Sequence, residues 1–464
     1  MFVFEQIQNL RGKHVVVMGL GLHGGGTATT AWLLRHGARV TVTDLQQRAA
    51  LRESIAKLPT SRRLSFILGR HRHEDFRSAD VIVANPGVPS TSPYLATAQR
   101  AGVAVINEAT LFFSRCPCRI IGVTGTKGKS TVSSLIAHLL KKSTPTSLAG
   151  NIRTTAMLGI LDRLTPKMTV VLELSSWQLE GLSSIRRSPE IAVVTNLLDD
   201  HLNQYISRRA YFTSKEEIWK YQDPTMSVIL NRDNPPLRTR GKGVHGRRYW
   251  FSRRYFPEEN GAFVRGGKYY FRENGKVSFV ASFSDSRLLG EHNVMNTLAA
   301  ITAAKVCGMK ARQIRESLRT FAGVPGRLEI IRSLRGVRYM NDTTATAPAA
   351  SIAALATVSK PVILIAGGTD KNLPYREMAQ AIRSSVQSLI LLPGTATVKL
   401  QTLLRSFHRP LHLAASMREA VRIAARNARP GTTVLLSPGA ASFGLFLHEF
   451  DRGEQFEKEV RRLR

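Results

Sequence analysis

Short apolar runs rich in valine, isoleucine and leucine recur along most of the chain and alternate with segments of helical periodicity. Near-continuous apolar runs are typical of parallel strands whose sheet is covered by helices on both faces. We therefore expect an α/β protein with more than one sheet. The pattern predicts strands at His14–Leu20, Ala38–Thr43, Val81–Ala84, Val103–Ile106, Ile120–Val123, Thr169–Leu172, Ile191–Thr195, Val228–Leu230, Val362–Ala366, Leu389–Leu392 and Thr433–Leu436.

Two interruptions of this rhythm divide the chain. One lies at 107–117, before the strand at Ile120, and the other at Phe321–Pro325, where glycine and proline end a helix. Residues 232–290 also break the alternation, and their glycine turns predict an antiparallel insertion before a helix from His292. We expect three domains, 1–107, 108–322 and 323–464, the outer two Rossmann-like and the central one a P-loop domain.

Composition adds a strong basic bias. The chain has 464 residues, with 66 Lys and Arg against 33 Asp and Glu, and a formal charge of +33. This excess first predicts a polyanionic partner. Its three cysteines form no disulfide or metal pattern, and Met1–Leu10 lacks the basic and apolar run of a signal peptide. We expect a soluble, cytoplasmic monomer that does not insert into a membrane.

A glycine-containing loop follows the strand at Ile120 and precedes a helix. Backbone N–H groups of such a loop converge on phosphate oxygens, Lys129 reaches the β- and γ-phosphates, and the Ser130 hydroxyl ligates Mg²⁺. The spacing departs from the usual G-x-x-x-x-G-K-[ST], because Gly122 and Gly125 flank the position of its first glycine. The loop predicts ATP binding through Gly125, Thr126, Lys127, Gly128, Lys129, Ser130 and Thr131.

Glu173 and His201 follow two strands of the predicted central sheet. The carboxyl ends of parallel strands share one edge, so both residues are candidate Mg²⁺ ligands beside this loop. Taken alone, a strand-end Glu is as often a helix cap, and a single His is more often structural. Lys215, within a helical segment at Arg208–Tyr221, would by itself be interpreted as a solvated lysine.

A second glycine-rich turn, Gly19–Gly24, follows the first strand, and Asp44 ends the next. This is the pattern of a dinucleotide-binding fingerprint, although backbone amides that face a diphosphate serve UDP as well as NAD.

Several segments in order resemble the Mur ligase family, and specifically its D-glutamate-adding branch. They are Gly125–Thr131, Leu172–Glu180 (similar to L-E-L-S-S-F-Q-L-E), Asn196–His201, Gly290–Asn296 (similar to G-x-H-N-x-x-N), Pro325–Glu329 (similar to P-x-R-x-E) and Asn341–Asp342. The resemblance covers essentially the whole chain.

This resemblance implies an enzyme of peptidoglycan precursor synthesis that uses ATP and Mg²⁺. ATP would phosphorylate the free carboxylate of UDP-N-acetylmuramoyl-L-alanine, and the amine of D-glutamate would displace phosphate from the acyl phosphate. The family's pattern also implies that its third domain reaches back over the nucleotide before chemistry.

The resemblance also implies residue roles. Lys129 would stabilise the γ-phosphate, Ser130 and Glu173 would hold one Mg²⁺, and His201 with a carbamylated Lys215 would hold another. Further ATP contacts would come from His292, Asn293, Asn296, Arg327 and Asp342. Substrate contacts would come from Leu22, His23, Asp44, Asn85, Pro86, Gly87 and Asn151 for the UDP-sugar, and from Lys371, Ser442 and Phe443 for D-glutamate. Thr344 stands where some relatives carry Lys, so no cationic role is assigned to it.

Alternatives remain open at this point. Within the family they are other Mur ligases and folylpolyglutamate synthetase. A different class, a nucleic-acid-dependent ATPase, is indicated by the basic and aromatic run Arg247–Phe256. The charge is spread over the three domains as +7, +16 and +10, whereas a footprint for one polyanion concentrates on one face.

Overall fold

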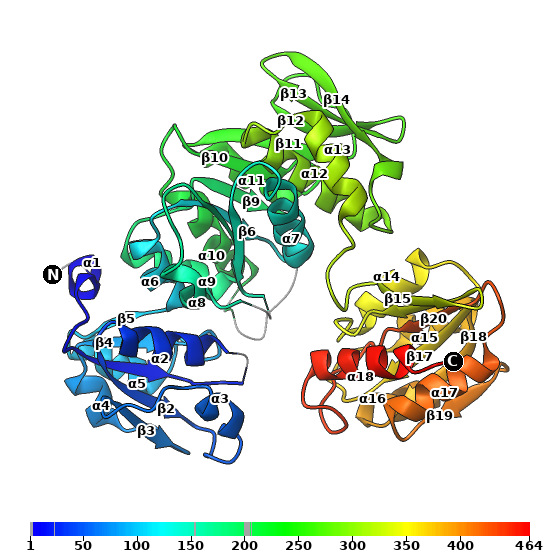
Figure 1. The fold of residues 1–464 in the computed structure, drawn as a ribbon, viewed down its shortest axis with the longest axis horizontal. Coiled ribbons are helices and arrows are strands. Elements are labelled where there is room, and N and C mark those ends of the chain that lie inside the picture. The colour runs from blue at the N-terminus through cyan, green and yellow to red at the C-terminus, as the bar shows by residue number, and fades with distance from the viewer. Residues whose placement is uncertain (1–2, 23, 153–154, 199–204, 206) are drawn as a thin grey trace. The chain divides into compact units, whose positions relative to one another are not determined.

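The structure is a computed structural model that describes residues 3–464 except 23, 153–154, 199–204 and 206. It contains three sheets flanked by helices, and the predicted α/β class is confirmed (Figure 1). By contacts the chain forms two units, one of Met1–Ser286 with Val294–Arg319 and one of Arg287–Asn293 with Thr320–Arg464. The first two sheets belong to the first unit and the third sheet to the second.

The first sheet has five parallel strands in the order β3-β2-β1-β4-β5. Its strands are β1 (His14–Met18), β2 (Arg39–Asp44), β3 (Leu64–Leu68), β4 (Val81–Ala84) and β5 (Ala104–Ile106). Its helices are α1 (Val3–Gln8), α2 (Gly25–Arg35), α3 (Arg52–Ala56), α4 (His73–Ser78), α5 (Pro93–Arg100) and α6 (Glu108–Arg115). The pattern missed β3, an edge strand that is only half-buried and has a serine within it.

The second sheet has nine strands in the order β14-β13-β12-β11-β10-β9-β6-β8-β7. They are β6 (Arg119–Thr124), β7 (Thr146–Gly150), β8 (Thr169–Glu173), β9 (Ile191–Val194), β10 (Ser227–Asn231), β11 (Arg247–Ser252), β12 (Gly261–Arg265), β13 (Lys268–Glu273) and β14 (Lys276–Ser282). Its helices are α7 (Lys129–Leu140), α8 (Met157–Leu161), α9 (Ser176–Glu180), α10 (Arg208–Lys220), α11 (Pro235–Arg240), α12 (Glu291–Val306) and α13 (Ala311–Thr320).

The insertion predicted at 232–290 needs one correction. Only β12, β13 and β14 pair antiparallel, with turns at Gly266–Gly267 and Asn274–Gly275, whereas β11 pairs parallel with both β10 and β12. The basic and aromatic composition of β11 hid a strand that continues the parallel sheet.

The third sheet has the order β15-β16-β20-β17-β18-β19, parallel except for the β15–β16 hairpin. Its strands are β15 (Glu329–Leu334), β16 (Val337–Asn341), β17 (Val362–Gly367), β18 (Val386–Leu392), β19 (Leu411–Leu413) and β20 (Thr433–Leu436). Its helices are α14 (Pro348–Thr357), α15 (Arg376–Ser385), α16 (Thr395–Leu403), α17 (Met417–Asn427) and α18 (Glu449–Arg461).

The central strands bury both faces, as the unbroken apolar runs predict. Every residue of β9, β17 and β20 is buried, because helices cover both sides of these strands. Across the described residues, no helix has the length and apolar character needed to cross a bilayer.

Candidate active site

The phosphate-binding loop runs from the end of β6 to the start of α7. Gly125 and Gly128 have φ angles of 139° and 86°, which glycine adopts without strain. A Cβ at Gly125 would lie 2.0 Å from Thr195 Oγ1, so the close approach of the neighbouring segment also requires glycine. The helix begins at Lys129, with Ser130 and Thr131 in its first turn, where the positive end of the helix dipole favours an anion.

The segment after β9 holds this loop in place. Thr126 N donates to Asn196 O (2.9 Å), and Lys127 N donates to Asn196 Oδ1 (2.9 Å). The Thr195 hydroxyl donates to Lys127 O (2.6 Å), and Leu198 N donates to Thr126 Oγ1 (3.0 Å). These bonds fix the loop conformation before any ligand binds.

Lys129 folds back over the loop. Its ammonium donates to Gly125 O and Thr126 O (2.9 and 3.1 Å), which keeps the charge at the mouth of the loop. Asn296, on α12, lies against the same loop, because a Cβ at Gly128 would approach its Oδ1 to 2.4 Å. The structure therefore brings these two predicted ATP contacts to one place.

Glu173 ends β8 and is paired in register with Val123 of β6. Its side chain is 2% exposed, and its Oε1 accepts from Asn151 Nδ2 (3.4 Å), while Asn151 N donates to Glu173 O (2.8 Å). A buried carboxylate on the strand beside the phosphate loop, joined to Asn151, agrees with the predicted edge of the sheet.

Lys215 is buried on α10, with 2% of its surface exposed. Its Nζ lies 4.7 Å from the centre of the Tyr211 ring, and the Tyr211 hydroxyl donates to Thr126 Oγ1 (3.4 Å). The interpretation of Lys215 as a solvated lysine is therefore wrong, since the residue is enclosed one turn away from a side chain that contacts the loop.

The glycine-rich turn after β1 packs against the loop after β4. A Cβ at Gly26 would lie 2.5 Å from Asn85 Nδ2, which itself donates to Gly19 O. The Asp44 carboxylate accepts from Leu20 N (2.8 Å) and Gly21 N (3.1 Å) and is 7% exposed. Asp44 thus orders the turn. Leu22 is exposed, Pro86 and Gly87 follow Asn85, and His23 lies outside the described residues.

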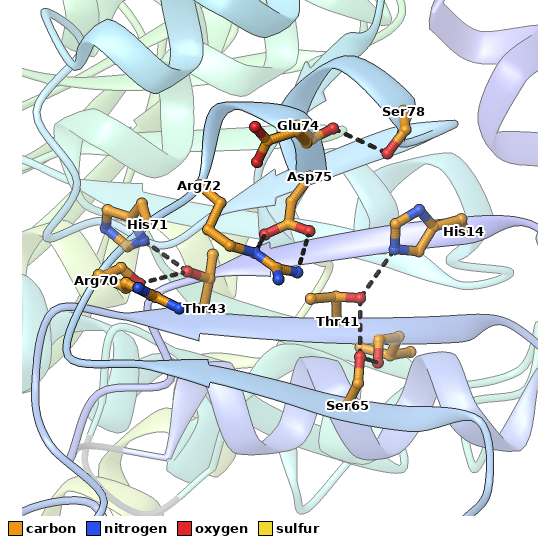
Figure 2. A network of polar contacts seen from close by, with 11 residues as sticks. His14, Thr41, Thr43, Ser65, Arg70, His71, Arg72, Glu74, Asp75 and Ser78 are labelled. Carbon is orange, nitrogen blue, oxygen red and sulfur yellow. Dashed lines mark hydrogen bonds and ion pairs between the residues drawn. The ribbon is translucent and has the colours of Figure 1, made fainter.

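A polar network continues from the end of β2 (Figure 2). The Thr43 hydroxyl contacts His71 Nδ1 (2.7 Å) and donates to Arg70 O (3.2 Å), and Arg70 forms a β-bridge with Asp44. Burial lowers the pKa of His71, although the charge of Asp44 opposes this shift. Arg70 and His71 are additional polar residues at the end of this sheet, and no sequence motif marked them.

In the second unit, two loops at carboxyl ends of strands are joined. Thr369 and Ala441 exchange backbone hydrogen bonds (2.9 and 3.0 Å), and the Thr369 hydroxyl donates to Phe443 O (2.6 Å). Ser442 is buried and the Phe443 side chain is 61% exposed. The exposed Lys371 donates to Thr346 Oγ1 (3.4 Å). The predicted D-glutamate contacts therefore come together at one edge.

Asp342 follows β16 in the same unit. Its carboxylate accepts from Leu328 N (3.2 Å) and the Ser437 hydroxyl (2.8 Å), while burial raises its pKa to about 6, opposed by these bonds and by Arg327. His292 and Asn293 lie in the first turn of α12. Burial lowers the pKa of His292, and Asn293 Nδ2 donates to Leu289 O (2.7 Å).

Comparisons with known proteins match the chain along its length. The Mur ligase MurD-like N-terminal domain matches residues 13–107, the Mur ligase middle domain 123–304, and the Mur ligase glutamate ligase domain 326–439. A UDP-N-acetylmuramoylalanine–D-glutamate ligase from Roseiflexus sp. is 44% identical, over 97% of this chain and 99% of that protein. A ligase of the same name from Symbiobacterium thermophilum is 35% identical, over 97% and 98%.

The chain belongs to the Mur ligase family. The resemblance stated from the motifs is thereby confirmed. Among solved structures, UDP-N-acetylmuramate-alanine ligase MurC from Thermotoga maritima matches with a TM-score of 0.62 and 19% identity, over 97% of this chain and 99% of that one. MurF ligase from the same organism matches with a TM-score of 0.58 and 17% identity, over 99% and 98%. At these identities the likeness shows the Mur ligase fold.

The motifs of this Mur ligase did not mark two buried charged residues. Arg452 on α18 is fully buried and donates to Thr343 Oγ1 (3.1 Å), Thr343 O (2.8 Å) and Ala440 O (3.1 Å). Burial lowers its pKa to about 10, so it stays charged at neutral pH. It ties the loop of Asp342 to that of Ser442.

Glu108 is the second buried charged residue that the motifs did not mark. It accepts from Leu158 N (3.1 Å), and a Cβ at Gly25 would lie 4.0 Å from its Oε2. Burial raises its pKa to about 7, opposed by the Leu158 and Met157 N–H groups. The arginine and glutamate lie outside the quoted motifs, so only the folded packing reveals them.

The remaining candidate residues are His201, proposed as a metal ligand, and Thr344. His201 lies in 199–204, outside the described residues, and in the part of the chain that is described no group of three or more His, Cys, Asp or Glu forms a metal cluster. Thr344, which has no assigned cationic role, donates its hydroxyl to Gly326 O (3.0 Å).

Proposed function

We propose that this chain is an ATP-dependent ligase that joins D-glutamate to UDP-N-acetylmuramoyl-L-alanine in peptidoglycan precursor synthesis. The observation that carries the proposal is the full-length match to ligases of that name, one of them 44% identical, together with an ordered phosphate loop. We further propose that segments 1–107, 108–322 and 323–464 take the UDP-sugar, ATP and D-glutamate respectively, and that the enzyme is a cytoplasmic monomer.

In the proposed reaction, the alanyl carboxylate attacks the γ-phosphorus of ATP and ADP leaves. The amine of D-glutamate then attacks the acyl carbon of the acyl phosphate, the C–O bond breaks, phosphate departs, and the amine loses a proton as the amide forms. Lys129, held over the loop by Gly125 O and Thr126 O, would transfer its hydrogen bonds to the γ-phosphate. Backbone N–H groups at the start of α7 would bind the remaining phosphate oxygens.

The chain's donors fit magnesium. Glu173 supplies a buried carboxylate and Ser130 a hydroxyl, both hard oxygen ligands at the edge that carries the phosphate loop. When bound, the ion would neutralise charge on the transferring phosphoryl group. We assign a second ion to His201 and to Lys215 as its carbamate.

The two loops of the second unit fit an amino-acid dicarboxylate. The Lys371 ammonium and the Ser442 hydroxyl would bind its carboxylates. Arg452 would anchor the Ser442 loop to the loop of Asp342. Arg327 and Asp342 would contribute to the ATP site.

A phosphate-release assay tests the proposal. Purified protein is supplied with ATP, Mg²⁺ and UDP-N-acetylmuramoyl-L-alanine, and with one of D-glutamate, L-glutamate, L-alanine, a diamino acid or a D-alanyl dipeptide. We expect release with D-glutamate alone, accompanied by a product heavier by one glutamyl residue. Release with a different amino acid, or with a folate substrate, would contradict the assignment.

A further inference from the structure

The outer face of β12, β13 and β14 carries a pocket remote from the motifs of the proposed reaction. It has a volume of about 390 Å³ and is lined by Tyr255, Phe263, Arg265, Gly266, Lys268, Tyr270 and Val277. This volume lies within the range of small-ligand sites. Its lining is aromatic and basic, and the reaction proposed above uses none of these residues.

Aromatic side chains cross the three strands in register. Phe263 of β12 pairs with Tyr270 of β13, and Tyr270 pairs with Phe279 of β14, with ring centres 5.7 and 5.9 Å apart. Tyr255 lies edge-on to Phe263 at 5.0 Å. Tyr255 and Phe279 remain 50% and 40% exposed, so this ladder presents accessible aromatic surface to solvent.

Only part of this face is used by packing within the domain, since Phe263 is buried and Tyr270 is half-buried against the core. The alternate residues of β13, Tyr269 and Phe271, are buried on the opposite face, where Lys305 of α12 lies 5.5 Å from the Phe271 ring. Because successive residues of a strand point to opposite faces, Tyr270 points away from that helix. The accessible rings of this face are therefore those of Tyr255 and Phe279, with part of Tyr270, while Phe263 supports them from below.

The charges on this face are all positive. Arg265 and Lys268 stand directly opposite each other across β12 and β13, an arrangement that destabilises a hairpin. Neither forms an ion pair within the described chain. Arg272 lies on the same face and donates to the Tyr255 hydroxyl (2.7 Å), with its guanidinium 5.5 Å from that ring. An anion bound here would relieve the repulsion between Arg265 and Lys268.

We propose that this face of β12–β14 binds single-stranded nucleic acid. Exposed rings on a sheet stack unpaired bases, and flanking cations bind the phosphates between them. A duplex hides the faces of its bases, so it would use only the cations. An acyl chain or lipid surface would gain little from the tyrosine hydroxyls that line the pocket, which makes a membrane the less favoured partner.

Fluorescence anisotropy with the full-length, nuclease-treated protein and a labelled twelve-nucleotide oligothymidine tests this. Tyr255→Ala with Tyr270→Leu should weaken binding about tenfold or more, since two of the rings that would stack on bases are lost. Arg265→Gln with Lys268→Gln should reduce the slope of log K against log salt by about 1.4, as two phosphate contacts disappear. Arg62→Gln with Arg63→Gln, an exposed pair in the first domain, removes the same charge and should leave affinity within about twofold.

Three controls keep the outcome decisive. D-Glutamate-dependent phosphate release should be unchanged in every variant, which shows that each one folds. A duplex of the same length should bind more weakly than the single strand and be insensitive to the tyrosine changes. Equal binding by the tyrosine variant and the wild type would overturn the proposal. The proposal would also be overturned if the tyrosine variant lost binding to phosphatidylglycerol vesicles while its affinity for oligothymidine stayed constant.

Discussion

At the scale of single residues, Lys215 is a basic side chain that is buried in the fold. A lysine that is 2% exposed is withdrawn from the solvent that normally stabilises its ammonium, and its Nζ lies 4.7 Å from the centre of the Tyr211 ring. Reaction of the neutral amine with CO₂ gives a carbamate and a proton, which would turn this buried cation into an oxygen ligand for magnesium.

Lys215→Ala should therefore lower kcat at least about a hundredfold, because a ligand of the second ion is lost while the loop stays intact. Formate or acetate should restore part of the activity by supplying a carboxylate. Lys220→Ala is the matched control on the same helix. Lys220 is half-exposed and pairs with Glu217 (2.6 Å), so its loss should change kcat less than about twofold.

Phosphate-release kinetics with and without formate measure both effects. If Lys215→Ala keeps near-normal activity and formate increases the activity of neither variant, Lys215 acts only in packing.

The sequence predicted which candidate residues lie close to the phosphate loop, but not what surrounds them. The motifs located Gly125, Lys129 and Glu173, because phosphate binding dictates local spacing and these residues lie close to it along the chain. Arg452 was missed, since its partners at Thr343 and Ala440 are 109 and 12 residues away and no local pattern joins them. Burial of Lys215 was missed for the same reason.

At the scale of elements, central strands with unbroken apolar runs were predicted. Of the edge strands, β5 was predicted, whereas β3, β7, β15 and β19 were not. β17 and β20 are buried throughout, whereas β3 at the edge of the first sheet is a short run that contains Ser65 and is only half-buried. β11 is central in its sheet but begins with two arginines, which obscured its parallel pairing. Edge strands and capping positions depend on tertiary neighbours, so periodicity alone does not specify them.

Helix α18 is also held by residues outside it, because Arg452 donates hydrogen bonds to Thr343 and Ala440. Arg452→Lys should destabilise the second unit by about 2–4 kcal/mol, because one ammonium does not reach all three acceptors of the guanidinium and stays buried. The KM for D-glutamate should rise as the loops of Asp342 and Ser442 lose their common anchor. Arg461→Lys on the same helix is the control. Arg461 is exposed and paired with Glu457, so its replacement should cost less than about 0.5 kcal/mol.

Urea unfolding and steady-state kinetics on both variants measure these two effects. Equal stabilities of Arg452→Lys and Arg461→Lys would show that the buried hydrogen bonds of Arg452 contribute nothing net.

At the scale of the whole molecule, the formal charge of +33 acts in two opposite directions. Like charges repel in the compact state, and the same field attracts the anionic substrates of the proposed reaction. Salt screens both interactions over a Debye length of about 8 Å at physiological ionic strength. Higher salt should therefore increase the stability of the fold while it weakens the attraction of anionic substrates.

Raising KCl from about 20 to about 300 mM should increase the melting temperature and lower kcat/KM for UDP-N-acetylmuramoyl-L-alanine several-fold, with kcat nearly constant. The reason for the split is that long-range attraction assists encounter, whereas Lys129 and its neighbours act at contact distance, where salt screens little. Sucrose at matched osmolarity separates screening from general stabilisation, because it should raise the melting temperature without reducing kcat/KM. Calorimetry and initial rates over the salt series measure the two responses. A kcat/KM that stays constant or rises with salt would show that the basic surface does not attract substrate. The remaining effects of the charge would then be nucleic-acid binding by β12–β14 and repulsion within the fold.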